Sequence, residues 1–335
     1  MIDGTRVTPV EPRSLIAATR PFVQEDASRS WFYVLSTMCI LVGGLSIAAF
    51  APWPWRVVGT VLASFVLVRG FVLYHDHMHG ALLRRSKVAR GIFYLYGLLI
   101  LAPSRAWRSS HNYHHSRVGR IEGSARGNYW LMTTRAWNEA STWTRFYYRF
   151  ARSPWIILFA YPLVFGYSIT AAALFRNPKH HWDSGLSLAL HGGAITGLWS
   201  WQGAAGALLV VIIPMSISTM IGAYLFYAQH TYVGMEILSD EEWSVPKAAV
   251  ASCSYLKLGW VMKWISGDIG YHHVHHLNAA IPFYRLADAK RSLPELKDPI
   301  ITTLRPSDIL RCLRLKLWDE DRHELVPFPR RRAAR

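Results

Sequence analysis

Residues 31–51 read WFYVLSTMCILVGGLSIAAFA, a run without a single charged side chain. Residues 57–74, VVGTVLASFVLVRGFVLY, form a second apolar run whose one charge is Arg69. A helix needs about 20 apolar residues to cross the hydrocarbon core of a bilayer. We therefore expect two transmembrane helices joined in a hairpin by Ala51-Pro-Trp-Pro-Trp55, with the Arg69 side chain extending toward the polar end of its helix.

The composition also indicates a membrane protein. Hydrophobic residues make up 51% of the 335 residues and charged residues 17%, whereas soluble chains carry about 25% charged residues. The 37 Lys and Arg against 21 Asp and Glu give a net charge of +16. In a membrane protein such an excess faces the anionic cytoplasmic leaflet, so no nucleic-acid partner is expected.

Three further apolar runs follow at 155–175, 186–201 and 205–227. The loop at 176–183 is basic, which places it inside, whereas the loop at 201–204 has no charge. Both loops satisfy this charge rule if the run at 155–175 lies in the membrane without crossing it and the other four runs cross it. We therefore predict four transmembrane helices in two hairpins, at about 31–51, 57–74, 186–201 and 205–227.

The predicted fold class is an all-α integral membrane protein with interfacial helices and a cytoplasmic cap that holds histidine motifs. It comprises a cytoplasmic segment at 1–30, a membrane domain at 31–286 and a basic cytoplasmic tail at 287–335. From Leu304 onward we expect the tail to be frayed or bound to lipid headgroups. Both termini and the cap are expected in the cytoplasm, at a bacterial inner membrane.

Histidines occur in three clusters near the ends of the predicted spans. Two have the pattern H-x-x-H-H and one contains H-x-x-x-H. Spacings of three and four residues bring imidazoles to one face of a helix, where they can converge on a metal. The residues in these registers are His75, His79, His111, His114, His115, His272, His275 and His276.

This number of imidazoles exceeds what one metal ion binds, so two ions are implied. Burying so many imidazoles beside a membrane is costly unless something binds them. All-imidazole coordination suits zinc, copper, iron or nickel, and spacing alone does not choose among them. The three cysteines lie far apart and form no C-x-x-C pair, which gives no support for a disulfide framework or an iron–sulfur site. His77 and His273 fall off the ligand faces, and we expect each either to support a ligand from outside the metal's coordination or to be merely polar.

These motifs resemble the three histidine boxes of the membrane-bound fatty acid desaturases. The matching segments are His75-Asp-His-Met-His79-Gly80, Trp107-Arg-Ser-Ser-His111-Asn-Tyr-His114-His115, and Gly270-Tyr-His272-His-Val-His275-His276-Leu with Ile281-Pro-Phe-Tyr-Arg-Leu286. Tyr224-Leu-Phe-Tyr-Ala-Gln-His230-Thr resembles the segment of that family which supplies one further ligand. The resemblance extends from about Val68 to Leu286.

The resemblance implies two iron ions and an O2-dependent reaction that leaves a double bond in a lipid acyl chain. It adds His230 to the eight histidines above as a ligand. Asp76 and Asp268 are the candidates for orienting a ligand imidazole. At Asp268 the chain departs from the Asn that many bacterial relatives carry, and the residues after His230 also differ from the commonest acyl-lipid members.

Several alternatives remain open at this stage. A membrane di-iron hydroxylase or a carotenoid ketolase would use similar boxes, although the segment after the third box resembles acyl-chain desaturases more closely. A histidine-rich metal transporter would place its ligands near the bilayer midplane, where His191 is the main candidate. The substrate is expected to be a membrane lipid or an acyl thioester. Without a His-Pro-Gly-Gly segment, a Gly-x-Gly-x-x-Gly motif or a cysteine cluster, the chain needs a separate electron donor, either a ferredoxin or a small haem protein with its reductase.

Overall fold

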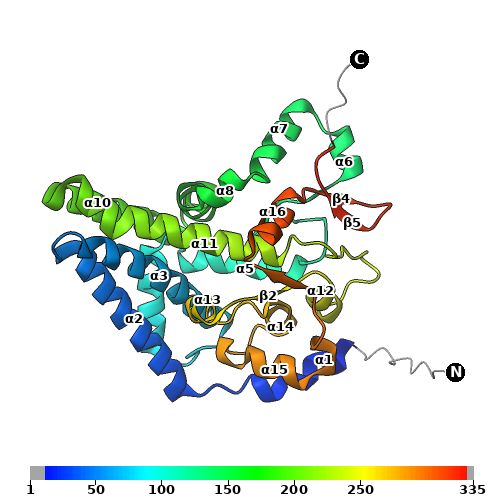
Figure 1. Cartoon of the computed structure of the whole chain (residues 1–335), viewed down its shortest axis with the longest axis horizontal. Helices are drawn as coiled ribbons and strands as arrows, with labels where there is room; N and C mark the ends of the chain where they lie inside the picture. The colour runs from blue at the N-terminus through cyan, green and yellow to red at the C-terminus, as the bar shows by residue number, and fades with distance from the viewer. Residues whose placement is uncertain (1–11, 330–335) are drawn as a thin grey trace.

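An apolar helical hairpin forms the first two long helices of the structure, a computed structural model that describes residues 12–329 (Figure 1). Helix α2 (Ala27–Phe50) starts where the Asp26 side chain accepts a hydrogen bond from the backbone N–H of Arg29. Helix α3 (Trp55–His79) returns after the proline-containing turn. The two helices pack closely, because a Cβ atom at Gly59 would lie 2.5 Å from the backbone nitrogen of Ala48.

A second apolar region consists of α10 (Trp182–Ala207), η3 (Leu208–Ile212) and α11 (Ile213–Gln229). Gly203 interrupts the helical backbone with φ 68° and ψ −166°. The neighbouring Gln202 accepts a hydrogen bond from Arg56 and donates one to the carbonyl of Ala49. The bend at Gly203 therefore lies beside the turn between α2 and α3 (Figure 1).

Three helical stretches of the described residues are long and apolar enough to cross a membrane: Ala27–Phe50, Trp55–His79 and Trp182–Gln229. The third contains both predicted spans of the second hairpin and the bend between them. The segment at 155–175 is not among the three, and consists of α8 (Pro154–Leu158), the π-helix η2 (Tyr161–Ala171) and α9 (Ala172–Arg176). The predominantly helical membrane architecture predicted from the sequence is confirmed.

The other helices are shorter. They are α1 (Pro12–Ala18), η1 (Arg20–Phe22), α4 (Lys87–Leu99), α5 (Ser104–Arg117), α6 (Thr134–Glu139), α7 (Thr142–Ala151), α12 (Val245–Ala251), α13 (Trp260–Ser266), α14 (His272–Leu277), η4 (Phe283–Arg285), α15 (Leu286–Ser292), η5 (Pro294–Leu296) and α16 (Pro306–Arg314).

Two small sheets modify the all-helical expectation. Strand β4 (Leu317–Asp319) pairs in parallel with β1 (Met132–Thr133) and antiparallel with β5 (Glu324–Val326). Strand β2 (Tyr255–Lys257) pairs in parallel with β3 (Ile301–Thr303). These strands are too short to produce an alternating pattern that the sequence could reveal.

The sheets correct the expectation of a frayed C-terminal tail. Leu317 and Trp318 are buried, and the Tyr148 hydroxyl donates a hydrogen bond to the carbonyl of Lys316. The apolar residues among the basic ones thus hold 304–329 against the rest of the chain. The final residues of the predicted tail, 330–335, and the first eleven of the predicted N-terminal segment lie outside the described residues.

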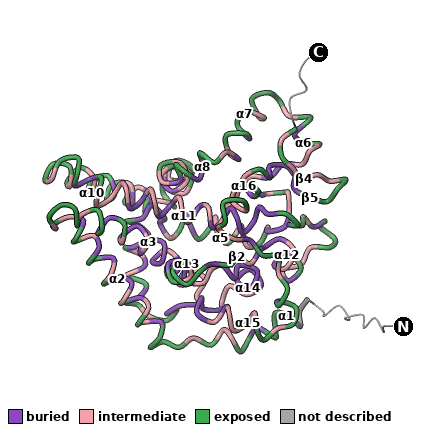
Figure 2. The backbone as a smooth tube through the Cα atoms, in the orientation of Figure 1, coloured by how far each residue is buried: buried purple, intermediate pink, exposed green. Residues whose placement is uncertain are grey.

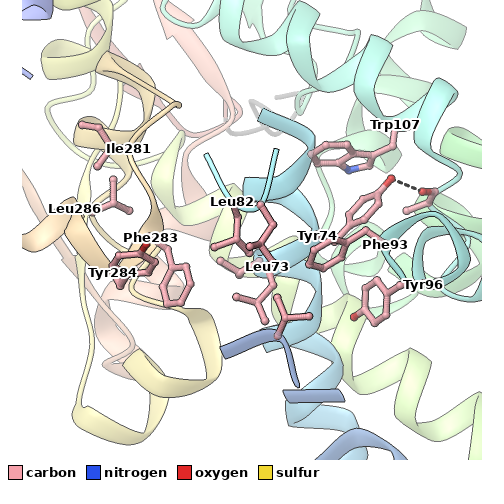
Figure 3. Close-up of a cluster of buried hydrophobic side chains, with 14 of the residues drawn as sticks. Leu73, Tyr74, Leu82, Phe93, Tyr96, Trp107, Ile281, Phe283, Tyr284 and Leu286 are labelled. Atoms are coloured by element: carbon pink, nitrogen blue, oxygen red, sulfur yellow. Dashed lines mark hydrogen bonds between the residues drawn. The ribbon is translucent and has the colours of Figure 1, made fainter. Parts of the chain in front are cut away.

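The main hydrophobic core lies where α3 meets α4, α5 and the segment after α14. Figure 3 shows Tyr74, Phe93 and Trp107 on one side of α3 and Phe283 and Tyr284 on the other. The Tyr74 hydroxyl donates a 2.7 Å hydrogen bond to the carbonyl of Ala102, which ties α3 to the start of α5. Figure 2 shows buried residues gathered around α14, whereas the outer faces of α2 and α10 are exposed, as lipid-facing surfaces are expected to be.

Candidate metal centre

Four elements bring the predicted ligands together. His75 and His79 lie one turn apart at the end of α3, which terminates at Gly80 in the left-handed conformation that glycine favours. The second motif lies in α5, and the third forms most of α14. His230 follows the last residue of α11. Segments more than 150 positions apart in the sequence therefore meet in one place.

The nine predicted histidine ligands form two groups. Within each group, every residue offers one nitrogen, and these nitrogens lie within 4.8 Å of one another. The first group consists of His75, His79, His111, His115 and His275, and the second of His114, His230, His272 and His276. The groups adjoin, because the rings of His115 and His276 stack with centroids 4.2 Å apart.

The short distances in the second group cannot be explained by hydrogen bonds alone. Nε2 of His272 lies 2.8 Å from Nε2 of His230 and 3.1 Å from Nε2 of His276, which in turn lies 3.2 Å from Nε2 of His114. A neutral imidazole nitrogen either donates one proton or accepts through one lone pair, so neither middle nitrogen can serve two partners. A cation that receives all four lone pairs resolves this conflict.

The first group has the same feature. Nε2 of His115 lies 3.1 Å from Nε2 of both His111 and His275, and the buried Nε2 of His79 has no hydrogen-bond partner among the described residues. Ligand nitrogens around a metal with bonds of about 2.1 Å lie roughly 3.0–3.4 Å apart. The observed spacings fit that geometry. Both groups are all-imidazole, a donor set that suits iron as well as zinc, copper or nickel.

Burial keeps these histidines neutral. It lowers the pKa of His114 and His276 well below the ordinary value, and neighbouring imidazoles lower both further. Burial also lowers the pKa of His230 to about 4. Neutral imidazoles have the free lone pair that metal binding requires. The second group is fully buried, whereas His79, His111 and His115 of the first group are partly exposed.

Asp76 connects the first group to a distant part of the chain. One oxygen of its fully buried carboxylate lies 3.1 Å from Nδ1 of His75. The other accepts a 2.7 Å hydrogen bond from the backbone N–H of Phe283. A carboxylate on the second nitrogen of a ligand imidazole orients the ring and raises its basicity. Asp268 is placed differently: no hydrogen bond joins it to any histidine of the described residues.

The histidines outside the ligand registers have other surroundings. Nδ1 of His77 lies 2.8 Å from the carbonyl of Leu82, and its ring stacks on Phe93. Both nitrogens of His191 are used within the protein, by the Leu99 carbonyl and the Tyr161 hydroxyl. His191 therefore has no free nitrogen for a transported metal. His273 is fully buried beside Tyr255 and belongs to neither group.

Trp107 was a sequence candidate for an aromatic lining of the site, whereas the contacts of Phe226 and Phe283 were not foreseen. The Trp107 ring stacks on His111 at 4.4 Å, and Phe226 packs edge-on against both His114 and His230. Phe226 precedes His230 by four residues, so helical spacing could have indicated this contact. The backbone bond from Phe283 to Asp76 leaves no comparable pattern in the sequence.

Comparisons with known proteins point to one family. The family model described as fatty acid desaturase matches residues 51–300, which is more than half of the chain. A fatty acid desaturase of Bacillus subtilis (strain 168) is 33% identical over 275 residues, covering 80% of this chain and 76% of the relative.

More distant relatives carry more specific names. An sn-1 oleoyl-lipid 12-desaturase of Synechocystis is 24% identical, covering 83% of this chain and 79% of its own. A chloroplastic sn-2 acyl-lipid omega-3 desaturase (ferredoxin) of Arabidopsis thaliana is 27% identical, covering 78% of this chain and 60% of its own. With a family match that includes all nine clustered histidines, the chain belongs to the fatty acid desaturase family.

Proposed function

We propose that this protein is an O2-dependent di-iron desaturase that introduces a double bond into the acyl chain of a lipid. The observation that carries the proposal is the pair of histidine groups, in which convergent nitrogens at 2.8–3.2 Å have unmatched lone pairs. Family membership supports iron as the metal and an acyl chain as the substrate. We assign all nine histidines as ligands, with Asp76 orienting His75.

The protein's own residues would hold two metal ions side by side and keep water away from one of them. The buried second group is packed against Phe226, whereas the partly exposed first group is covered by Trp107. When bound, iron supplies the redox chemistry, in which O2, two electrons and two protons accept the two hydrogens of a –CH2–CH2– unit and leave –CH=CH– and two water molecules. The electrons would come from a separate donor.

We further propose four transmembrane helices, with the bend at Gly203 as the tip of the second hairpin. The two tips lie together, and the basic residues Arg84, Arg85 and Lys87 flank the opposite end of α3. The positive-inside rule then places the histidine groups and both termini in the cytoplasm. Residues 1–30 and 287–335 would be the cytoplasmic segments around a membrane domain at 31–286, in a bacterial inner membrane.

The substrate and donor classes are proposed from the chemistry and from the relatives. The names of the Synechocystis and Arabidopsis relatives specify an oleoyl-lipid and an acyl-lipid, and the second name includes ferredoxin. We propose a membrane lipid, or an acyl thioester at the membrane surface, as substrate. An acidic ferredoxin or a small haem protein with its reductase would suit the +16 chain as donor.

A mass-spectrometric profile of fatty acids from cells that express the protein tests this function. The matched control is the triple variant His111→Ala, His114→Ala, His115→Ala. We expect acyl chains lighter by two hydrogens, which are absent in the variant. Acyl chains that gain an oxygen atom instead would favour a hydroxylase. No change in any acyl chain, with iron-loaded protein and a competent donor present, would count against acyl substrates altogether.

A further inference from the structure

Arg69 is a buried charge in the middle of a candidate membrane span. It belongs to α3 and is 3% exposed. A charged residue inside an apolar span costs about 2.5–3.5 kcal/mol on insertion scales, so such residues are retained for a reason. The sequence suggested that its side chain would extend toward the polar end of the helix. The structure holds the guanidinium in the protein interior, where it contacts residues of the histidine-bearing cap.

The guanidinium is bound on several sides. Its Nε donates a 3.1 Å hydrogen bond to the hydroxyl of Thr37 in α2, and Nη1 donates to the backbone carbonyl of Trp264 in α13. Its central carbon lies 4.6 Å from the ring centroid of Trp264, 5.4 Å from that of Tyr33 and 5.8 Å from that of Phe283. Aromatic faces attract cations at these distances, and the attraction strengthens when water is excluded.

Besides α2, Arg69 contacts two chain segments that lie on either side of α14 in the sequence. Trp264 precedes this helix in α13, and Phe283 follows it. Helix α14 carries His272, His275 and His276. One side chain from α3 therefore connects both flanks of the helix that supplies three of the nine proposed ligands.

Phe283 extends this connection to a fourth ligand. Its ring faces the guanidinium, and its backbone N–H donates to the Asp76 carboxylate, which in turn contacts Nδ1 of His75. Figure 3 shows the Phe283 ring between α3 and the segment that follows α14. A displaced Phe283 would leave the buried Asp76 carboxylate without its backbone donor, and His75 with a less firmly held partner.

We propose that Arg69 is a positioning residue for the metal centre, which sets α14 and the Asp76–His75 pair relative to α3. The proposal rests on the proposed function, since it assumes that the histidine groups bind metal. The guanidinium suits the role because it donates in fixed directions and stacks on aromatic rings at the same time, whereas a lysine ammonium provides one flexible point charge.

The test is an iron(II) titration of the full-length protein in lipid nanodiscs, in competition with a chelator. Arg69→Met keeps the apolar stem and removes the hydrogen bonds and the charge. We expect at least one of the two ions to bind about tenfold more weakly, the lower end of the effect of losing an orienting partner. Arg69→Lys, which restores the charge over the aromatic rings, should recover part of the affinity.

Arg56→Met is the matched control. Arg56 is in the same helix and also bridges helices, through the Ala48 carbonyl and the Gln202 side chain, but at the end away from the histidines. Its loss should leave iron affinity at the wild-type value. Phe283→Leu provides a second variant should Arg69→Met not fold, because it removes the ring and keeps the backbone N–H. It should also weaken iron binding.

Two results would overturn the proposal. One is wild-type iron affinity in a folded Arg69→Met or Phe283→Leu variant, with folding checked by thermal unfolding. The other is an equal loss of affinity in Arg56→Met, which would make the effect one of general helix packing. Since metal binding is measured without turnover, iron-loaded wild-type protein that fails to desaturate would refute the proposed function only. A wild-type protein that binds no iron would refute both.

Discussion

The carboxylate of Asp76 joins His75, a proposed metal ligand, to the backbone of Phe283, which lies 207 positions after Asp76. Asp76 is fully buried, and each of its two carboxyl oxygens has its own hydrogen-bond partner within the protein. The arrangement fixes the ring of His75 and ties the segment after α14 to α3 at the same time. Under the proposed function, the orientation of His75 and the packing of the cap depend on the same side chain.

Replacing Asp76 tests this dual role. Asp76→Asn keeps the size of the side chain and an acceptor for the Phe283 N–H, but replaces the carboxyl group beside His75 with an amide. Loss of such a partner typically weakens metal binding about 10–100-fold, so we expect the iron(II) affinity to decrease by a factor in that range. Chelator competition on the purified variant measures the change. Unaltered affinity would mean that Asp76 serves packing alone.

The second group predicts which histidines hold iron. His230→Ala removes one of the four proposed ligands of the buried second group, and we expect the iron content to fall from two ions per chain to about one, with loss of desaturation. His191→Ala is the comparison, because His191 bonds the Leu99 carbonyl and the Tyr161 hydroxyl and contacts neither group. It should keep both ions. Metal analysis of the two purified variants measures their iron content. An equal loss of iron in both variants would contradict the assignment.

Burial of the imidazoles predicts how the metal-free protein responds to acid. An unfolded histidine takes up a proton below a pH of about 6.5, whereas burial lowers the pKa of His230 to about 4 in the folded protein. The unfolded state therefore binds more protons in this window, and stability falls as the pH falls from about 6.5 to 4. The free energy of unfolding should change by up to about 1.4 kcal/mol per pH unit for each such histidine.

Thermal unfolding of the metal-free protein at several pH values measures this effect. The triple variant His111→Ala, His114→Ala, His115→Ala serves as control, because burial also lowers the pKa of these three histidines well below the ordinary value. Its melting temperature should depend less steeply on pH. Identical pH dependence of the two proteins would show that the clustered imidazoles do not govern acid stability.

The folded C-terminal region predicts a stability effect far from the metal groups. Trp318 is 4% exposed in β4, so Trp318→Ala should lower the free energy of unfolding by about 3–5 kcal/mol. Trp260 in α13 is 83% exposed, and Trp260→Ala should change the stability in detergent by less than about 0.5 kcal/mol. Denaturant titrations of both variants provide the measurement. Similar values for the two would indicate that the tail does not pack as described.

The helical membrane fold could be predicted because a long apolar run such as 31–51 is visible in the sequence as a candidate transmembrane helix. The histidine groups could also be predicted, since spacings of three and four residues place ligands such as His111 and His115 on one face. Which histidines share a group could not. His114 and His115 are adjacent in sequence but point to different groups, because successive residues on a helix lie about 100° apart.

The interior contacts were harder to foresee. Arg69 bonds Thr37 and Trp264, which are 32 and 195 positions away, and no local pattern encodes such partners. The strand pairing of residues 317–319 with 132–133 was hidden for the same reason. Chain segments of two or three residues show no periodicity, so the order of the tail depends on tertiary packing.

The most direct test uses the purified, iron-loaded protein in lipid nanodiscs with a reduced ferredoxin and its reductase, under isotopically heavy O2. If the two histidine groups carry out desaturation, lipid acyl chains become lighter by two hydrogens and contain no heavy oxygen, and His230→Ala gives no product. Acyl chains that carry the heavy oxygen, or desaturation that survives in His230→Ala, would contradict the account.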